Sequence, residues 1–430
     1  MSDFDFRFSK TGQPSPPRRT QATMRMLILC DARGSNPDRP ALAQRRMRTL
    51  DVDAFESLLA HYSPSCEISD TSRLTVTDLE QFSPDALFQS LPNFAALPQT
   101  LIDDGPEPQD SNTRDAEDDT LQRLLGRPAQ TDKPAARASG LLDQFIKKVV
   151  EDESPARNST SASAPDTDVL AERMRNVLHH PALQRIEATW RGLHELARGV
   201  ETGDGLTINM LDVTTTELDA DIRQADQSVL ADRLLSNTDD GWDLIVLEST
   251  LEPGDATLIA GLGTLAHAAG GKLLCGITTP APDDQPAALW QALRDSAVSD
   301  RIVVTAPRVL MRAPYGKQFE PPERITFEEC AAVPQPEQLL WGSAALLLAT
   351  CVAQSFEAGE PAANLSDQPA ANDRPQFVFE RDGERAAQPV TEHLLSDSQA
   401  EHLTSLWGIL PLRAARHGNR LHVAALESLA

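Results

Sequence analysis

The chain has 430 residues, of which 40% are hydrophobic and 24% are charged, proportions typical of a folded protein with two or three domains. Its formal net charge of -25 argues against nucleic acid as the main partner, because an acidic surface repels phosphates. No run reaches the roughly 18 apolar residues that cross a bilayer, so we expect no membrane insertion.

The five cysteines are scattered and form no Cys-x-x-Cys pair, which favours free thiols over a disulfide framework or a metal site. The N-terminus lacks the charged and apolar regions of a signal peptide. These features together predict a cytoplasmic protein.

Residues 1–100 predict a small α+β domain. The apolar run at 24–30 is typical of a strand, and it ends in an Asp-Ala-Arg-Gly loop. Residues 52–59 place valine, phenylalanine and leucines on one helical face, and 74–79 predict a second strand. A further helix is expected at Pro84, because a capping serine precedes a proline at the first helical position.

Residues 101–166 predict a flexible linker, because this acidic stretch, rich in Pro and Ser, has too few apolar residues to offset the entropy of ordering. One short amphipathic helix interrupts it at 139–150. This helix either docks into a groove on a partner or folds back on its own domain. The residues that share its apolar face are Leu142, Phe145, Ile146 and Val149.

Residues 167–356 predict an α/β domain. Between 206 and 306, short apolar runs alternate with helical stretches of about 10–15 residues, which is the pattern of βαβ units in a largely parallel sheet. A buried apolar helix is expected over 339–352. Residues 357–430 then predict a loop and a small α/β extension. The fold class is therefore α/β, with a central, largely parallel βαβ sheet domain preceded by a smaller α+β domain and a disordered linker.

Residue types that often act in catalysis or ligand binding are present, but their spacing does not predict a reaction centre. The G-x-G-x-x-A string at 261–266 lies inside a predicted helix, where close helix packing explains it better than a dinucleotide site. Glu328 and Glu329 are adjacent and so do not share a face, which favours a solvated acidic patch over a catalytic pair. Arg308 and Arg312 are expected to pair with local carboxylates such as these. We therefore expect no catalytic, cofactor or metal site, and no enzyme.

Several motifs follow one another in fixed order through the predicted α/β domain. They are W-R-G within a segment that begins H-P, then W-x-x-L-R, then P-R-x-x-x-R-x-P-Y-G, then F-E-E and L-L-W-G. Their residues are Trp190, Arg191, Gly192, Trp290, Arg294, Pro307, Arg308, Arg312, Pro314, Tyr315, Gly316, Glu328, Glu329, Trp341 and Gly342. In these motifs the chain resembles the large sheath subunit of the bacterial type VI secretion contractile apparatus.

Two shorter matches accompany this resemblance. In the large subunit, a helix with an L-L-D motif is the handle for the AAA+ ATPase that disassembles contracted sheaths, and Leu141, Leu142 and Asp143 match it here. The first hundred residues resemble the small sheath subunit, through a V-D helix start at Val52 and a Phe-x-Pro-Asp segment at Phe82.

The resemblance implies a structural, non-enzymatic sheath component. It would assemble by strand exchange with other sheath subunits around an inner tube protein, with the AAA+ ATPase as a further partner and no cofactor. The family's further C-terminal helical region has no counterpart here, which leaves open an accessory, cap or baseplate-proximal protein that docks without polymerising. A nucleotide-binding α/β enzyme is the remaining alternative.

Overall fold

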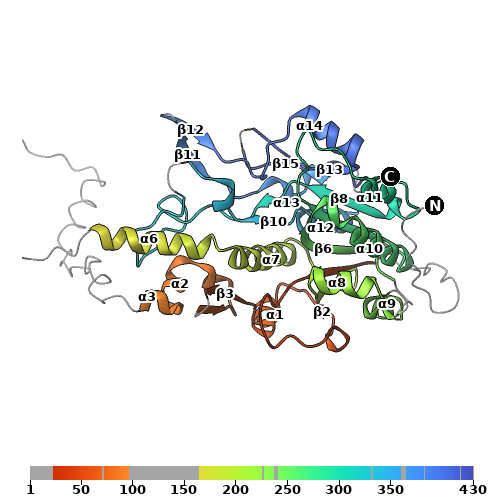
Figure 1. Ribbon diagram of the computed structural model, residues 1–430, viewed down its shortest axis with the longest axis horizontal. Coiled ribbons are helices and arrows are strands. Elements are labelled where there is room, and N and C mark those ends of the chain that lie inside the picture. Colours follow the sequence, from red (N-terminus) through yellow and green to blue (C-terminus); the bar gives the residue numbers. More distant parts are fainter. Residues whose placement is uncertain are drawn as a thin grey trace, which may run out of the picture. The chain divides into compact units, whose positions relative to one another are not determined.

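The computed structural model describes residues 23–69, 72–95, 164–224, 227–236, 241–330, 333–359, 365–381, 383–416 and 418–429. Residues 1–96 and 169–430 form one compact unit, and the following description concerns that unit. Figure 1 shows its central sheet with helices packed against it.

A seven-stranded sheet, in the order β13-β8-β7-β6-β1-β5-β2, forms the centre of the unit. Every neighbouring pair is parallel except β2 with β5. The strands of this sheet are β1 (Met24–Cys30), β2 (Arg48–Thr49), β5 (Leu206–Asp212), β6 (Leu244–Leu251), β7 (Lys272–Ile277), β8 (Ile302–Ala306) and β13 (Ile409–Pro411). The structure confirms the predicted α/β class with a mostly parallel sheet.

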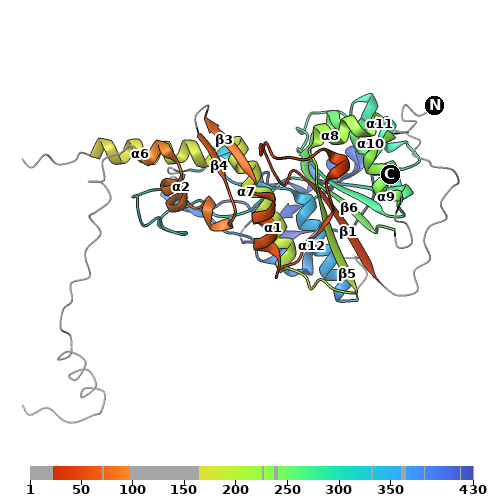
Figure 2. The same cartoon turned by 90° about the horizontal axis from the view of Figure 1, so that it is seen from below.

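Helices cover both faces of the sheet, which explains why its strands are almost uniformly apolar. One face packs against α8 (Thr215–Ile222), α9 (Val229–Leu235), α10 (Ala256–Ala268) and α11 (Ala288–Arg294). The other face packs against α12 (Ala344–Glu357), which in turn packs on α7 (Pro181–Arg198). Figure 2 shows these helices on either side of β1, β5 and β6.

The remaining elements lie outside the central sheet. The helices are α1 (Phe55–Tyr62), α2 (Pro84–Ser90), α3 (Pro92–Ala95), α6 (Ala164–Leu178), α13 (Pro369–Asn372) and α14 (Asp397–His402). Four antiparallel pairs involve β3 (Ser65–Ser69) with β4 (Ser72–Thr75), β9 (Val309–Leu310) with β10 (Trp341–Gly342), β11 (Val378–Arg381) with β12 (Glu384–Ala387), and β14 (Arg413–Ala414) with β15 (Leu421–His422). No helix in the described parts of the chain is long and apolar enough to cross a membrane.

The N-terminal segment does not fold apart from the α/β region. Strand β1 lies between β5 and β6, in register with β5 from Met24 opposite Leu206 to Cys30 opposite Asp212. At the other end of the chain, β13 forms an edge of the same sheet. The boundaries drawn from the sequence at residues 100 and 356 therefore do not separate folded units. The predicted linker lies outside the described residues up to 163, and its last residues begin α6.

Three local predictions differ from the structure. The helix expected after the β5 strand is divided into α8 and α9, with Ser228 capping the second helix. Trp341 belongs to β10, and α12 begins only at Ala344, because Ser343 caps it and Trp341 pairs with Leu310. Val52 precedes α1 and is 46% exposed, so it is not part of the apolar face of that helix.

Candidate functional site

Five of the motif-segment residues meet in one buried cluster, which we call the arginine centre: Glu187, Arg191, Arg312, Tyr315 and Glu329. Arg312 lies at its middle, with its side chain only 4% exposed. Its Nε atom is 2.7 Å from Glu187 Oε1, and its Nη1 atom is 2.7 Å from Glu329 Oε2. Two carboxylates from distant parts of the chain thus share one guanidinium. Glu329 is only 1% exposed, so the solvated acidic patch predicted from the sequence is wrong for this residue.

Tyr315 completes the contacts around this guanidinium. The Arg312 side chain stacks 4.1 Å from the centre of the Tyr315 ring, a favourable cation–π position. The Tyr315 hydroxyl accepts a 2.9 Å hydrogen bond from Arg191, and its backbone N–H donates to Glu329 at 2.8 Å. The arginine centre therefore ties α7 to the loop that follows β9.

The charged groups of the arginine centre keep one another ionised. Burial alone would raise the pKa of the Glu187 carboxyl, but the charges and hydrogen bonds of Arg312 and Arg191 outweigh it and lower that pKa. Burial would likewise lower the pKa of Arg312, but Glu187 and Glu329 raise it well above its usual value. Both partners therefore stay ionised inside the protein, which suits a structural joint.

The other two charged motif residues of this stretch have separate partners. Arg308 forms a bidentate pair with Glu392, at 2.9 Å and 2.6 Å, rather than with the adjacent glutamates. Glu328 accepts a 3.2 Å hydrogen bond from the backbone N–H of Lys317. A Cβ atom on Gly316 would lie 2.1 Å from the Glu328 carboxylate. The glycine at this motif position therefore leaves room for that carboxylate. Pro314 lies between Arg312 and Tyr315, while Pro307 directly follows β8 and has a cis peptide bond.

The motif tryptophans connect separate segments of the chain through hydrogen bonds from their indoles. Trp190 on α7 donates a 3.1 Å hydrogen bond from its indole to the carbonyl of Ala32, just after β1. Trp290 on α11 donates at 2.9 Å to the carbonyl of Trp407 near the C-terminus. Trp341 donates at 2.7 Å to the carbonyl of Pro336. Each large aromatic thus packs in the core and satisfies its one donor.

Arg294, Gly192 and Gly342 also serve packing. The Arg294 guanidinium donates to the backbone carbonyls of Leu406 at 2.7 Å and Leu429 at 3.2 Å, so it holds the C-terminal segment. A Cβ atom on Gly192 would lie 2.7 Å from Leu346 on α12, and one on Gly342 would lie 2.2 Å from a methionine sulfur. The motif residues therefore map to joints between elements, and three of them, Arg308, Trp341 and Gly342, also border a cleft of about 1040 Å³.

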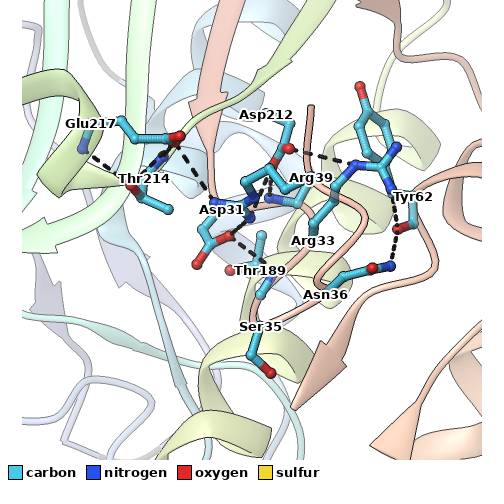
Figure 3. A network of polar contacts seen from close by, with 12 residues as sticks. Asp31, Arg33, Ser35, Asn36, Arg39, Tyr62, Thr189, Asp212, Thr214 and Glu217 are labelled. Atoms are coloured by element: carbon cyan, nitrogen blue, oxygen red, sulfur yellow. Dashed lines mark hydrogen bonds and ion pairs between the residues drawn. The ribbon is translucent and has the colours of Figure 1, made fainter. Parts of the chain in front are cut away.

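A second polar cluster, shown in Figure 3, joins the carboxyl ends of β1 and β5. We call it the strand-end network; it contains Asp31, Arg39, Arg45, Asp212 and Glu217. Arg39 pairs with Asp31 and lies 3.2 Å from Asp212, and the Asp212 carboxylate also accepts from the backbone N–H of the residue after Asp31 at 3.0 Å.

Arg45 extends the network to α8. It donates to the carbonyl of Asp212 at 2.9 Å and to Glu217 at 2.8 Å. Glu217 is also part of a capping box with Thr214. Burial opposes ionisation of Glu217, but its hydrogen bonds to Arg45 and Thr214 outweigh burial and lower its pKa to about 2. The network therefore attaches the N-terminal segment to the α/β region through charges as well as strand pairing.

The sequence interpretation did not single out this network. A usable signal was present, because Asp31 and Asp212 each stand where a predicted apolar strand ends. The carboxyl ends of neighbouring parallel strands meet at one edge of a sheet. What the sequence could not show was that β1 and β5 are neighbours, since 175 residues separate Cys30 from Leu206 in the chain.

The G-x-G-x-x-A string serves helix packing in the structure. Gly261 and Gly263 lie inside α10, where a Cβ atom would approach Ile222 to 2.3 Å and Ile302 to 2.4 Å. The string does not open the helix, as a phosphate-binding turn requires. The predicted docking helix with Leu141, Leu142, Asp143, Phe145, Ile146 and Val149 lies outside the described residues.

Comparison with known proteins agrees with the motif pattern. Residues 166–234 and 280–430, over half of the chain, match the family described as VipB: EvpB/VC_A0108, tail sheath N-terminal domain. The chain is 25% identical over 218 residues to the type VI secretion system sheath protein TssC1 of Pseudomonas aeruginosa. That match covers 44% of this chain and 44% of the length of TssC1. The chain therefore belongs to the VipB family of type VI secretion tail sheath proteins.

Proposed function

We propose that the chain is a structural, non-enzymatic subunit of a type VI secretion contractile sheath in the cytoplasm. The observation that carries this proposal is the family match over more than half of the chain, together with the similarity to TssC1. The match includes every residue of the arginine centre, so the part of the chain shared with the family contains its main internal joint.

The chemistry of the arginine centre supports a mechanical role. Its ionised groups are satisfied by one another at 2.7–2.9 Å. Buried, fully paired networks of this kind make a region rigid. A rigid block is what a sheath subunit needs, because contraction then occurs by changes of packing between subunits rather than by deformation within them.

We further propose that the N-terminal segment plays the part of a small sheath subunit. Three contacts support this: β1 pairs with both β5 and β6, Trp190 bonds to Ala32, and Arg45 bonds to Glu217. The chain would then combine parts resembling both sheath subunits within one folded unit.

Assembly would use strand exchange with other sheath subunits around an inner tube protein. The hairpins β3–β4 and β11–β12 support this, since in the described parts of the chain each is a sheet of only two strands. Two-stranded sheets are marginally stable alone and can gain a strand at an outer edge, although the Ser65 backbone of β3 already bonds to Arg33 and Ser35. The helix at 139–150 would bind an AAA+ disassembly ATPase through Leu141, Leu142 and Asp143.

Negative-stain microscopy of the full chain, alone and co-expressed with its neighbouring sheath and tube proteins, tests the assembly. We expect tubes or sheath fragments in the co-expressed sample. Discrete particles that bind to sheath ends would favour an accessory or cap protein, and a chain that stays monomeric and bound to nothing would contradict a sheath role.

The ATPase contact has its own test. Changing Leu142 and Phe145 to Asp should abolish capture of the chain by the ATPase, because two charges would interrupt the predicted apolar face. Circular dichroism should show that the rest of the protein is folded as before. Unchanged capture would exclude this helix as the binding site.

A further inference from the structure

A large cleft lies at the carboxyl edge of the central sheet, beside the strand-end network and the Arg308–Glu392 pair. Its volume is about 1040 Å³, and it is bordered by Asp31 after β1, by Thr214 to Thr216 after β5, and by the end of β6. The chain passes from β5 on one side of β1 to β6 on the other, which makes this edge a topological switch point. Open α/β sheets bind ligands at this position.

The charge of the cleft is mostly negative. Its basic side chains are His179, Arg185 and Arg308, and the charge of Arg308 is already balanced by Glu392. The carboxylates that line it are Asp31, Asp219 and Glu392, which are paired with Arg39, Arg223 and Arg308, and Glu248, Asp255 and Glu337, which have no salt bridge within the described residues. This excess of carboxylates disfavours a phosphate or a nucleotide and favours a cation.

Glu248 is the carboxylate that is hardest to explain without a ligand. It lines the cleft from β6 at a β-bulge, where the pairing of β6 with β7 shifts between Leu247 and Thr250. Such bulges redirect side chains and are common beside functional sites. Glu248 is only 7% exposed, and it forms no salt bridge within the described residues. Buried carboxylates normally have a cationic partner.

The one hydrogen-bond partner of Glu248 among the described side chains is a neutral hydroxyl. The Thr189 hydroxyl has one proton, which it shares between the Glu248 carboxylate and the carbonyl of Arg185, 2.9 Å away. Burial raises the pKa of the Glu248 carboxyl to about 7, with Asp31 raising it further and Thr189 and Arg185 opposing. A cation in the cleft would meet a buried carboxyl that has a neutral hydroxyl as its hydrogen-bond partner and no salt bridge within the described residues.

We propose that this cleft binds a basic peptide segment of a partner protein, with a Lys or Arg side chain reaching Glu248. The cleft is as large as the biggest small-molecule sites, which suits several residues of a peptide. Leu251, Leu258 and Trp341 provide apolar wall for the methylene stem of such a side chain, while the carboxylates receive its charged end. The proposal concerns the chain itself and holds whether or not it polymerises.

The test measures binding of a short fluorescent peptide with arginines between glycines, by anisotropy, to the full chain at physiological salt. The matched probe is the same peptide with citrulline, which keeps the shape of arginine and removes its charge. We expect the arginine peptide to bind and Glu248→Gln to weaken it about tenfold or more, the usual effect of losing a charged hydrogen bond. Thr216→Arg, which adds a cation at the rim, should weaken it as well.

The control is Glu56→Gln, the same change on the exposed surface of α1, away from the cleft. It separates specific binding from general attraction to an acidic protein. Equal weakening by Glu248→Gln and Glu56→Gln, or equal binding of the arginine and citrulline peptides, would overturn the proposal. Glutamine has nearly the shape of glutamate, so a thermal-unfolding scan should show that both variants remain folded.

Discussion

Replacing Arg312 with methionine tests whether the arginine centre holds the fold together. The change keeps most of the side-chain length but leaves Glu187 and Glu329, which are 0% and 1% exposed, without their shared cation. Removing one partner of a buried ion pair costs about 3–5 kcal/mol, because the remaining charge stays buried. Typical folding stabilities are about 5–15 kcal/mol, so a large share of the total would be lost.

Arg308→Met is the matched control, four positions earlier in the same motif. The Arg308 and Glu392 side chains are 36% and 15% exposed, so water screens their pair. An ion pair of that kind contributes about 0–1 kcal/mol. Urea denaturation of both variants and the wild type, followed by circular dichroism, gives the free energies of unfolding to compare.

The charge argument also predicts a rescue. Adding Glu187→Gln and Glu329→Gln to Arg312→Met should recover part of the lost stability, because neutral amides cost less to bury than carboxylates. Arg312→Met alone should gain stability, relative to wild type, as pH falls from 7 to 5 and the orphaned carboxylates become protonated. The reasoning is refuted if both methionine variants lose the same stability, or if the amides bring no recovery.

Three further predictions concern single positions and use the same urea assay. Burial raises the pKa of Glu248 from 4.5 to about 7, so the wild-type fold loses stability as pH rises through that range. The free energy of unfolding of Glu248→Gln should therefore match that of wild type at pH 5 and exceed it by up to about 3 kcal/mol at pH 8. A difference between the two proteins that does not change with pH would contradict this. Gly34→Ala should cost about 1–3 kcal/mol, because Gly34 has φ +58° and a Cβ atom would lie 2.5 Å from the Ser65 carbonyl; an unchanged midpoint would show that the loop moves freely. Trp290→Phe should cost about 1–3 kcal/mol, since the Trp407 carbonyl loses its donor; a neutral result would mean that another group replaces the indole.

The amino-acid sequence by itself determined the class of the fold and the family. Near-continuous apolar runs alternating with helical stretches required a mostly parallel sheet with both faces covered, and such a sheet is present. The motif order was enough to suggest the sheath family, and in the structure the motif residues sit at joints between elements. The fold class and the motif order depend on local periodicity and residue identity, both of which are visible in the sequence.

Tertiary structure decided which distant segments meet. Local periodicity predicted β1 as a strand, but only packing places it between β5 and β6, because strand order depends on the area that each arrangement buries. The same holds for Arg312, whose partner Glu187 lies 125 residues away. Burial of Glu248 at a β-bulge is likewise set by the register of neighbouring strands, which no single segment specifies.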